Sequence, residues 1–221
     1  MAAKMGRVVS VNVGQPRTVE FKGRTVTTAI FKVPLAGKVP LRGVNLRGDD
    51  QADRGVHGGP DRAVYAYASE DYAWWRERLA RDLTPGTFGE NLTTSEINVN
   101  GALIGERWRA GTAVLQVRSP RVPCSKLAVV MDDPVFVRTF ARGLRFGAYM
   151  AIIAEGEIGA GDDVEIVFRP SHALTVSEMG KIVMFEPNRV HELLMVPELT
   201  ESWREWAFEK TAERERGKAS A

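Results

Sequence analysis

Up to about residue 169 the chain alternates between short apolar or β-branched runs and breaks at glycine and proline. Runs of this kind indicate β-strands. The predicted strands span residues 7–13, 18–21, 25–31, 63–67, 113–118, 149–154 and 164–168. Lys22 and Gly23 separate two of them as a two-residue hairpin turn does. Many short strands with tight connections predict a mainly β fold with some α-helix, built on an antiparallel β-barrel.

A few helical segments interrupt this β-rich region. Ser69 precedes EDYAWWRERLAR as an N-cap residue, and Asp133 with Pro134 resembles a cap followed by a first-turn proline. Pro123 stands in front of SKLAVVM, where proline is favoured at a helix start. We expect these peripheral helices to cover the openings of the barrel.

The pattern of apolar and polar residues changes after Pro170, where helical periodicity replaces the alternation typical of strands. The starts of three helices are marked by the capping box of Thr175 and Glu178, by Pro187 and by Thr200. In the last of these helices Trp203 and Trp206 share one face. We therefore predict a barrel domain at residues 1–169 and a small three-helix domain at residues 170–221.

Composition narrows the class of protein. The 221 residues are 44% hydrophobic and 26% charged, which is ordinary for a globular protein. A net charge of +2 gives no argument for binding nucleic acid. The longest apolar runs, such as residues 149–154, are far too short for a membrane span, and the N-terminus lacks the apolar core of a signal peptide. We expect a cytoplasmic protein without nucleic-acid or membrane partners.

The loop at residues 48–62, GDDQADRGVHGGPDR, is rich in glycine and aspartate and precedes a predicted strand. It could be a long turn whose aspartates bind their own backbone. It could instead hold a ligand, with His57 and Arg62 as hydrogen-bond donors and the glycines allowing close backbone approach. A third alternative is a hard divalent cation bound by Asp49, Asp53 and His57.

The segment at residues 83–94, LTPGTFGENLTT, allows a concave arrangement of backbone N–H groups that would bind an anion, with Asn91 adding a side-chain donor. The plainer alternative is a connecting loop.

The one cysteine, Cys124, lies in SPRVPCSKL. We expect it in the first turn of a helix begun by Pro123, where the helix dipole together with Arg121 and Lys126 would favour the thiolate. The alternatives are a buried inert cysteine and a nucleophile paired with His57, although no third residue that would orient such a pair is identifiable.

Taken in order, GDDQADRGVHGGPDRAVYAY, GTFGENLTT and RVPCSKL resemble the MOSC family, a domain also found at the C-terminal end of molybdenum cofactor sulfurases. GAYMAIIAEGEIGAGDDVEI extends the likeness over roughly residues 40–168. The segments TVTTAIFKVPLAGKV and ELLMVPELTESWREWAF are similar to the YiiM-like branch, whose members append a three-helix domain. The resemblance implies a β-rich, barrel-like fold.

The resemblance also implies a molybdenum–pterin cofactor whose metal is bound by the motif cysteine, here Cys124. It implies reduction of small N-hydroxylated compounds, such as hydroxylaminopurines, with electrons from a separate flavoprotein reductase. His57 or an aspartate of the first loop, Asp53 among them, would deliver a proton. The chain has no flavin, dinucleotide or iron–sulfur motif, which agrees with an external electron donor.

The candidate cofactor-binding residues follow from the chemistry of the implied pterin, which carries a phosphate and a polar ring. For the cofactor phosphate they are Lys32, Arg62, Arg121 and Lys126; for the ring or substrate they are His57, Asn91 and the backbone of Gly89.

Two different classes of function stay open. Cys124 could carry a persulfide, or the barrel could hold molybdenum cofactor without turnover. The helical tail could be an interaction module, with a homodimer as one candidate assembly, although Trp203 and Trp206 fit a packed bundle core equally well. No Schiff-base lysine is identifiable, so pyridoxal phosphate is not expected.

Overall fold

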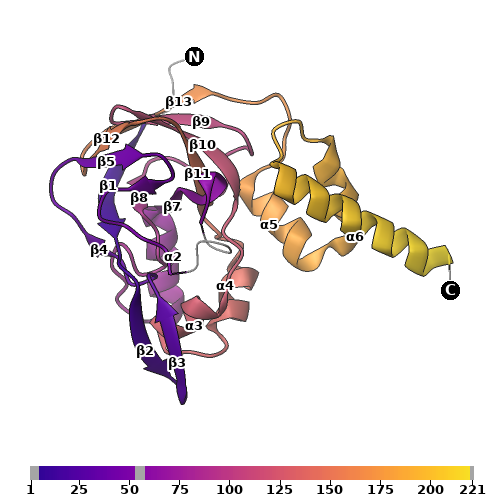
Figure 1. Cartoon of the computed structure of the whole chain (residues 1–221), viewed down its shortest axis with the longest axis horizontal. Coiled ribbons are helices and arrows are strands. Elements are labelled where there is room, and N and C mark those ends of the chain that lie inside the picture. The colour runs from indigo at the N-terminus through magenta and orange to yellow at the C-terminus, as the bar shows by residue number, and fades with distance from the viewer. Residues whose placement is uncertain (1–4, 53–57, 220–221) are drawn as a thin grey trace.

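A computed structural model of the chain describes residues 5–52 and 58–219. Seven strands form a closed barrel (Figure 1). Their order around the barrel is β13 (Asp163–Phe168), β9 (Arg107–Ala110), β10 (Ala113–Pro120), β11 (Ala148–Ala154), β7 (Val64–Ala68), β8 (Leu92–Ser95) and β1 (Met5–Val13). Pairing of β1 with β13 closes it. The predicted mainly β barrel with helices is confirmed.

The prediction of a purely antiparallel barrel was wrong at one pair, because β7 and β8 run parallel. The other strand pairs of the barrel are antiparallel. A parallel pair needs a long crossover, and here the helix α2 (Ser69–Leu79) and the following loop supply it. The barrel is therefore mixed.

The hairpin of β2 (Arg17–Phe21) and β3 (Arg24–Thr28) confirms the predicted turn: Lys22 and Gly23 both have positive φ, 49° and 73°. The strand predicted for residues 25–31 ends early, at Thr28, whose hydroxyl accepts a bond from the Ile30 N–H at 3.2 Å. This local bond competes with strand pairing. The sequence did not reveal two strands of the barrel, β8 and β9. It also did not reveal the short strands β4 (Val33–Pro34), β5 (Val39–Arg42), β6 (Asn45–Leu46) and β12 (Gly156–Ile158).

The predicted helices of the barrel region are present, but their starts are shifted. Ser69 is the first residue of α2 rather than its cap; the N-cap is Ala68, which makes no side-chain capping bond. The helix expected after Asp133 is α4 (Phe136–Gly143), since the Asp133 carboxylate accepts the Val135 N–H at 2.9 Å and delays the helix. The remaining elements are the 3₁₀ turn η1 (Pro60–Arg62) and α3 (Ser125–Met131).

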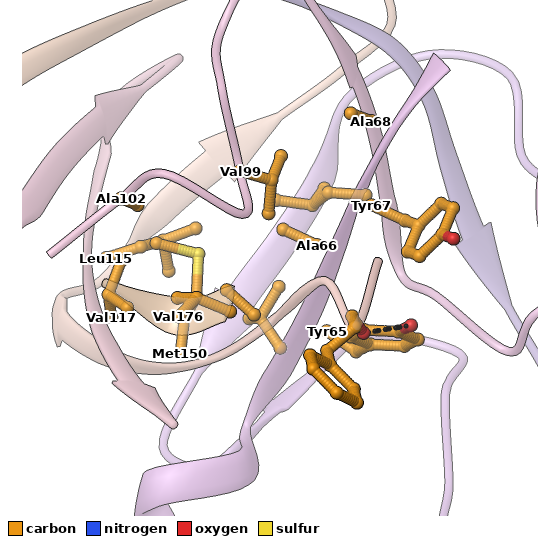
Figure 2. Close-up of a cluster of buried hydrophobic side chains, with 14 of the residues drawn as sticks. Tyr65, Ala66, Tyr67, Ala68, Val99, Ala102, Leu115, Val117, Met150 and Val176 are labelled. Carbon is orange, nitrogen blue, oxygen red and sulfur yellow. Dashed lines mark hydrogen bonds between the residues drawn. The ribbon is translucent and has the colours of Figure 1, made fainter. Parts of the chain in front are cut away.

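The barrel is filled by apolar side chains from both its strands and the C-terminal region. Figure 2 shows Leu115, Val117 and Met150 from the strands packed with Val176, and all four are fully buried. Full burial of such a side chain contributes about 1.5–3 kcal/mol. The helix α5 (Val176–Phe185), which begins with Val176, is therefore part of the same core.

The C-terminal helices lie beside the barrel (Figure 1). Half of the predicted capping box is confirmed: Thr175 is the N-cap of α5, and its hydroxyl accepts the Glu178 N–H at 3.1 Å. The Glu178 carboxylate accepts a bond from Arg189 Nη1 at 2.6 Å. The middle predicted helix is a 3₁₀ helix, η2 (Pro187–Met195), and α6 (Glu201–Ala219) follows. Gly180 lets α5 approach closely, because a Cβ there would lie 2.3 Å from the Phe146 ring.

Membrane-spanning length and apolarity are not combined in any helix within residues 5–52 and 58–219.

Candidate functional site

One cavity gathers residues that are far apart in the sequence. It holds about 640 Å³ of empty space, counting its open mouth. It lies where β7, β11 and the turn between β10 and α3 meet three segments near residues 28–32, 49–52 and 88–91. Its lining includes seven residues predicted from the sequence: Lys32, Arg62, Gly89, Asn91, Arg121, Cys124 and Lys126.

Cys124 is half-buried and lines this cavity, which argues against an inert core cysteine. The prediction that it lies in a first helical turn was wrong by one residue. Its backbone is extended (φ −125°, ψ 172°), and its carbonyl accepts the Leu127 N–H at 3.0 Å. It is the N-cap residue of α3, which accepts the first helical bond without itself being helical.

Arg121 supplies positive charge next to the thiol. Its side chain is buried, at 4% exposed, and Nη2 lies 3.8 Å from Cys124 Sγ. Burial by itself would lower the pKa of Arg121, but the nearby charges of Cys124, Tyr149 and Tyr65 raise it overall. A permanent cation at this distance stabilises a negatively charged sulfur.

Arg121 also has an unused donor. Its Nη1 is buried and has no hydrogen-bond partner among the described residues. Buried polar groups nearly always have a partner, and an unpaired one is costly. A group that points into the wall of a cavity and lacks a partner indicates a ligand that would accept its hydrogen bond.

Lys32 behaves differently from Arg121, although both line the same cavity. Its ammonium forms an ion pair with Asp49, and both side chains are buried. Burial lowers the pKa of Lys32, and the Asp49 carboxylate partly counters this. The Lys32 charge is thus balanced inside the protein.

Asn91 holds the cavity wall together. Its amide nitrogen donates to Asp49 Oδ2 at 2.8 Å and to the Asn12 carbonyl at 3.3 Å. Its oxygen accepts the Tyr65 N–H at 3.1 Å. Both amide hydrogens are therefore used by the protein, and this geometry makes Asn91 a positioning residue.

Tyr149 is a cavity residue that the sequence did not single out. It lies on β11, within the motif GAYMAIIA, where the sequence pattern predicts only a strand. The guanidinium carbon of Arg62 lies 6.0 Å from the centre of its ring. Burial raises the pKa of Tyr149, while Arg121 and Arg62 act in the opposite direction. Its hydroxyl is a protonated donor at neutral pH.

The remaining predicted site residues are Gly89, His57, Asp53 and Asp49. Gly89 has a φ of +81°, which glycine adopts without strain, and a Cβ would meet Ile30 at 2.7 Å; its role toward a ligand stays a prediction. His57 and Asp53 lie outside the described residues. Asp49, the third candidate for a cation site, is already bound to Lys32. No group of three or more His, Cys, Asp or Glu side chains in the described ranges could hold a metal ion.

Comparison with known proteins shows the family of this chain. The MOSC domain family matches residues 53–165. This range includes β7, β10, the N-cap residue Cys124 of α3, and β11. The protein YflK of Bacillus subtilis (strain 168) is 36% identical over 200 residues, 89% of this chain and 90% of its own. The chain belongs to the MOSC domain family.

Within the MOSC family, two further likenesses are informative. The crystal structure of YiiM from Geobacillus stearothermophilus superposes with a TM-score of 0.76 at 32% identity, covering 93% of this chain and 98% of that one. The YiiM-like branch predicted from sequence is thereby confirmed, and its C-terminal helices are present. A protein of Gibberella moniliformis (strain M3125 / FGSC 7600) named "Reductase" is 30% identical over 81% of this chain and 32% of its own length.

Proposed function

We propose that this MOSC protein is a molybdenum-cofactor-dependent oxidoreductase that reduces small N-hydroxylated compounds, hydroxylaminopurines among them, with Cys124 as the molybdenum ligand. Membership of the MOSC family and the relative named a reductase support redox chemistry in general terms. The observation that carries the proposal is Arg121, a buried cation with an unpartnered donor, next to Cys124 in the wall of a cavity.

The residues present fit a molybdenum–pterin group. A thiolate is a soft ligand that suits a thiophilic metal. The pterin carries an anionic phosphate, and Arg121, Arg62 and Lys126 line the same cavity. Arg121 Nη1 is buried without a hydrogen-bond partner in the described part of the chain, so it can donate to an anionic group of the cofactor. When bound, the cofactor supplies a metal centre capable of two-electron exchange.

The side chains of this chain would divide the remaining work. Cys124 would hold the metal, and the Arg121 guanidinium, with Nη2 at 3.8 Å, would stabilise a negative charge on its sulfur. The Lys32–Asp49 pair and Asn91 hold the wall in place. Tyr149 keeps a proton on its hydroxyl beside Cys124 and is a candidate donor, with His57 and Asp53 as the donors expected from sequence.

The overall reaction is R–NHOH plus two electrons and two protons giving R–NH₂ plus water. The N–O bond breaks, nitrogen is reduced, and the oxygen leaves as water. The electrons come from a separate flavoprotein reductase, which is part of the proposal.

The test is to produce the wild-type chain and Cys124→Ser in cells that make molybdenum cofactor, with Ser125→Ala as the neighbouring control. We expect bound molybdenum, measured by mass spectrometry, and reduction of 6-N-hydroxylaminopurine with a flavoprotein reductase in the wild type and the control. Cys124→Ser should lose at least ten-fold in both, roughly 1.4 kcal/mol or more of binding. Equal molybdenum in Cys124→Ser would contradict the role of the thiol. Cyanide-releasable sulfur on Cys124 without molybdenum would instead support a sulfur carrier.

A further inference from the structure

Asp71 is a buried carboxylate outside the cavity beside Cys124. It lies in the first turn of α2, is 3% exposed and is not among the residues that line the cavity. An acidic residue in a first helical turn interacts favourably with the helix dipole, and Glu70 does so while it stays exposed. Burial adds a free-energy cost that this interaction does not require. The burial of Asp71 therefore needs another explanation.

The partners of Asp71 use both oxygens of its carboxylate. Arg145 Nη1 donates to Oδ1, and the amide nitrogen of Asn100 donates to Oδ2. Burial raises the pKa of Asp71, and these two bonds act in the opposite direction. Asp71 thus connects α2 to two loops: the loop after β8, with Asn100, and the loop after α4, with Arg145.

Asn100 extends this contact to Gly147, next to the start of β11. Its amide oxygen accepts the Gly147 N–H at 3.1 Å, and its backbone carbonyl accepts the Ser177 N–H at 2.9 Å. The backbone bond fixes where Asn100 lies but not which way its amide group is turned. An ionised carboxylate only accepts hydrogen bonds, so Asp71 keeps the amide nitrogen on its own side and leaves the oxygen for Gly147.

Gly147 joins this series of bonds to Arg121. Its carbonyl accepts the Arg121 N–H at 3.4 Å. Its φ is +66°, and a Cβ would lie 2.6 Å from the Ala66 carbonyl oxygen, so its backbone fits tightly against β7. On the same strand, the Tyr65 hydroxyl donates to the Phe146 carbonyl at 2.8 Å, and the Tyr65 ring centre lies 6.0 Å from the Arg121 guanidinium carbon. A shift of Gly147 would therefore move the backbone of Arg121 and the surroundings of its side chain.

We infer that Asp71 and Asn100 are positioning residues of the candidate site. The Asp71 carboxylate sets the direction of the Asn100 amide. Through Gly147, that amide holds Arg121 where its buried Nη1 donor can bind an anionic group. The inference rests on the proposed function for the identity of that group, a phosphate-bearing cofactor, and it adds two residues that do not line the cavity.

The test measures binding of inorganic phosphate to the full chain by calorimetry. Asp71→Asn keeps the size of the side chain but replaces one acceptor oxygen by a donor, so Asn100 or Arg145 loses its partner. We expect phosphate to bind about ten-fold more weakly, the lower end of the effect of losing an orienting partner at a metal site. The control is Glu70→Gln, at an exposed acidic residue of the same helical turn, which should bind phosphate like the wild type.

A second variant, Asn100→Ser, leaves Asp71 in its ion pair with Arg145 and removes only the link to Gly147. It should weaken phosphate binding by a similar factor. Urea unfolding verifies that each variant folds, and Asn100→Ser carries the test if Asp71→Asn does not fold.

The rescue variant exchanges the two side chains. In Asp71→Asn combined with Asn100→Asp, the amide at position 71 can accept from Arg145 and donate to the carboxylate at position 100, which accepts the Gly147 N–H. Each donor then has an acceptor again, so this double variant should recover most of the wild-type phosphate affinity. Asn100→Asp alone sets two carboxylates against each other and should stay weak.

A role in folding alone predicts a different result. In that case phosphate affinity of the folded Asp71→Asn protein would equal that of wild type, or would fall by the same factor with and without Arg121. We expect instead that Asp71→Asn has no further effect in the Arg121→Met background, because both residues act on one donor. Equal effects in the two backgrounds, failure of the exchanged pair to recover, or absence of phosphate binding in wild type would overturn the inference.

The outcomes for the two proposals are distinguishable, because phosphate binding is measured without molybdenum. Loss of phosphate affinity in Asp71→Asn with recovery in the exchanged pair supports the positioning role whatever the molybdenum content. Absence of molybdenum and of reduction in the wild type overturns the proposed function and leaves the phosphate result standing.

Discussion

Lys32 and Arg121 are two buried cations in the wall of one cavity, and they differ in the partners that the fold gives them. Lys32 has a carboxylate partner, Asp49, which also accepts the Gly14 N–H at 2.7 Å. Arg121 has the Cys124 sulfur at 3.8 Å and one nitrogen without a partner in the described residues. The Lys32 charge therefore stabilises the cavity wall, whereas Arg121 keeps a donor that can bind a ligand.

The physical reason lies in the cost of burial. A buried charge without a partner is expensive, so a protein that keeps one without a function would gain stability by losing it. The Lys32–Asp49 pair removes that cost internally. The cost at Arg121 is met only when an anionic thiolate, or an anionic ligand, comes into contact with it. The cation that keeps a donor without a hydrogen-bond partner in the described residues is therefore the better guide to function.

The largest effect is expected from Asp49→Asn, which leaves Lys32 buried without a carboxylate. Removing one partner of a buried pair costs about 3–5 kcal/mol. Urea unfolding should show a loss of this order, and Asp82→Asn, at a carboxylate side chain that is 91% exposed, should show almost none. Equal stability of the two variants would mean that the Lys32 pair does not support the wall.

A second and smaller effect is expected from Arg121→Met, which keeps the bulk of the side chain and removes its charge. Binding of inorganic phosphate should weaken at least ten-fold, about 1.4 kcal/mol. Alkylation of Cys124 by iodoacetamide at neutral pH should slow by a similar factor, because the thiolate loses its cation. The contrasting variant is Lys32→Met: its unfolding free energy should fall while the alkylation rate of Cys124 stays near that of wild type. Identical alkylation rates in wild type and Arg121→Met would remove the distinction between the two cations.

The smallest effect concerns alkaline pH. The pKa of Lys32 in the folded state lies below its ordinary value of 10.5, mainly because of burial. Between the lowered value and 10.5 the unfolded chain binds more protons than the folded one, so Lys32 makes the free energy of unfolding rise with pH in this window. Below the lowered value its contribution is constant. Urea unfolding at a series of pH values should show this rise in wild type and not in Lys32→Met; parallel curves for the two proteins would count against it.

Much of the fold followed from local patterns. The alternation of apolar and polar residues located most strands of the barrel, and the hairpin at Lys22 and Gly23 followed from turn chemistry. The Thr175 cap was readable because it depends on residues three positions apart. The 3₁₀ form of η2 and the shifted start of α4 could not be predicted from the sequence, because competing local bonds and packing decide them.

The candidate site was predictable as a set of residues and not as a geometry. The motifs placed Cys124, Arg121 and Arg62 among the candidates, and the structure brings them to one cavity. Nothing in the spacing revealed that Asp49 would neutralise Lys32, because the pair joins two residues 17 positions apart, one just before β4 and the other after β6. Tyr149 was missed because a tyrosine within a strand pattern looks like core.

The amino-acid sequence by itself determined the strand-rich barrel, the helical tail and the residue types that gather around the thiol, because each of these depends on neighbours along the chain. Tertiary structure alone decided the parallel pairing of β7 with β8, the ion pair that balances the Lys32 charge and the unpartnered Nη1 donor of Arg121 in the described residues. These depend on which distant segments meet and on how much water their contact excludes. Because burial sets the free-energy cost of each charge, the buried and unpartnered donor of Arg121 marks the cation that can bind a ligand.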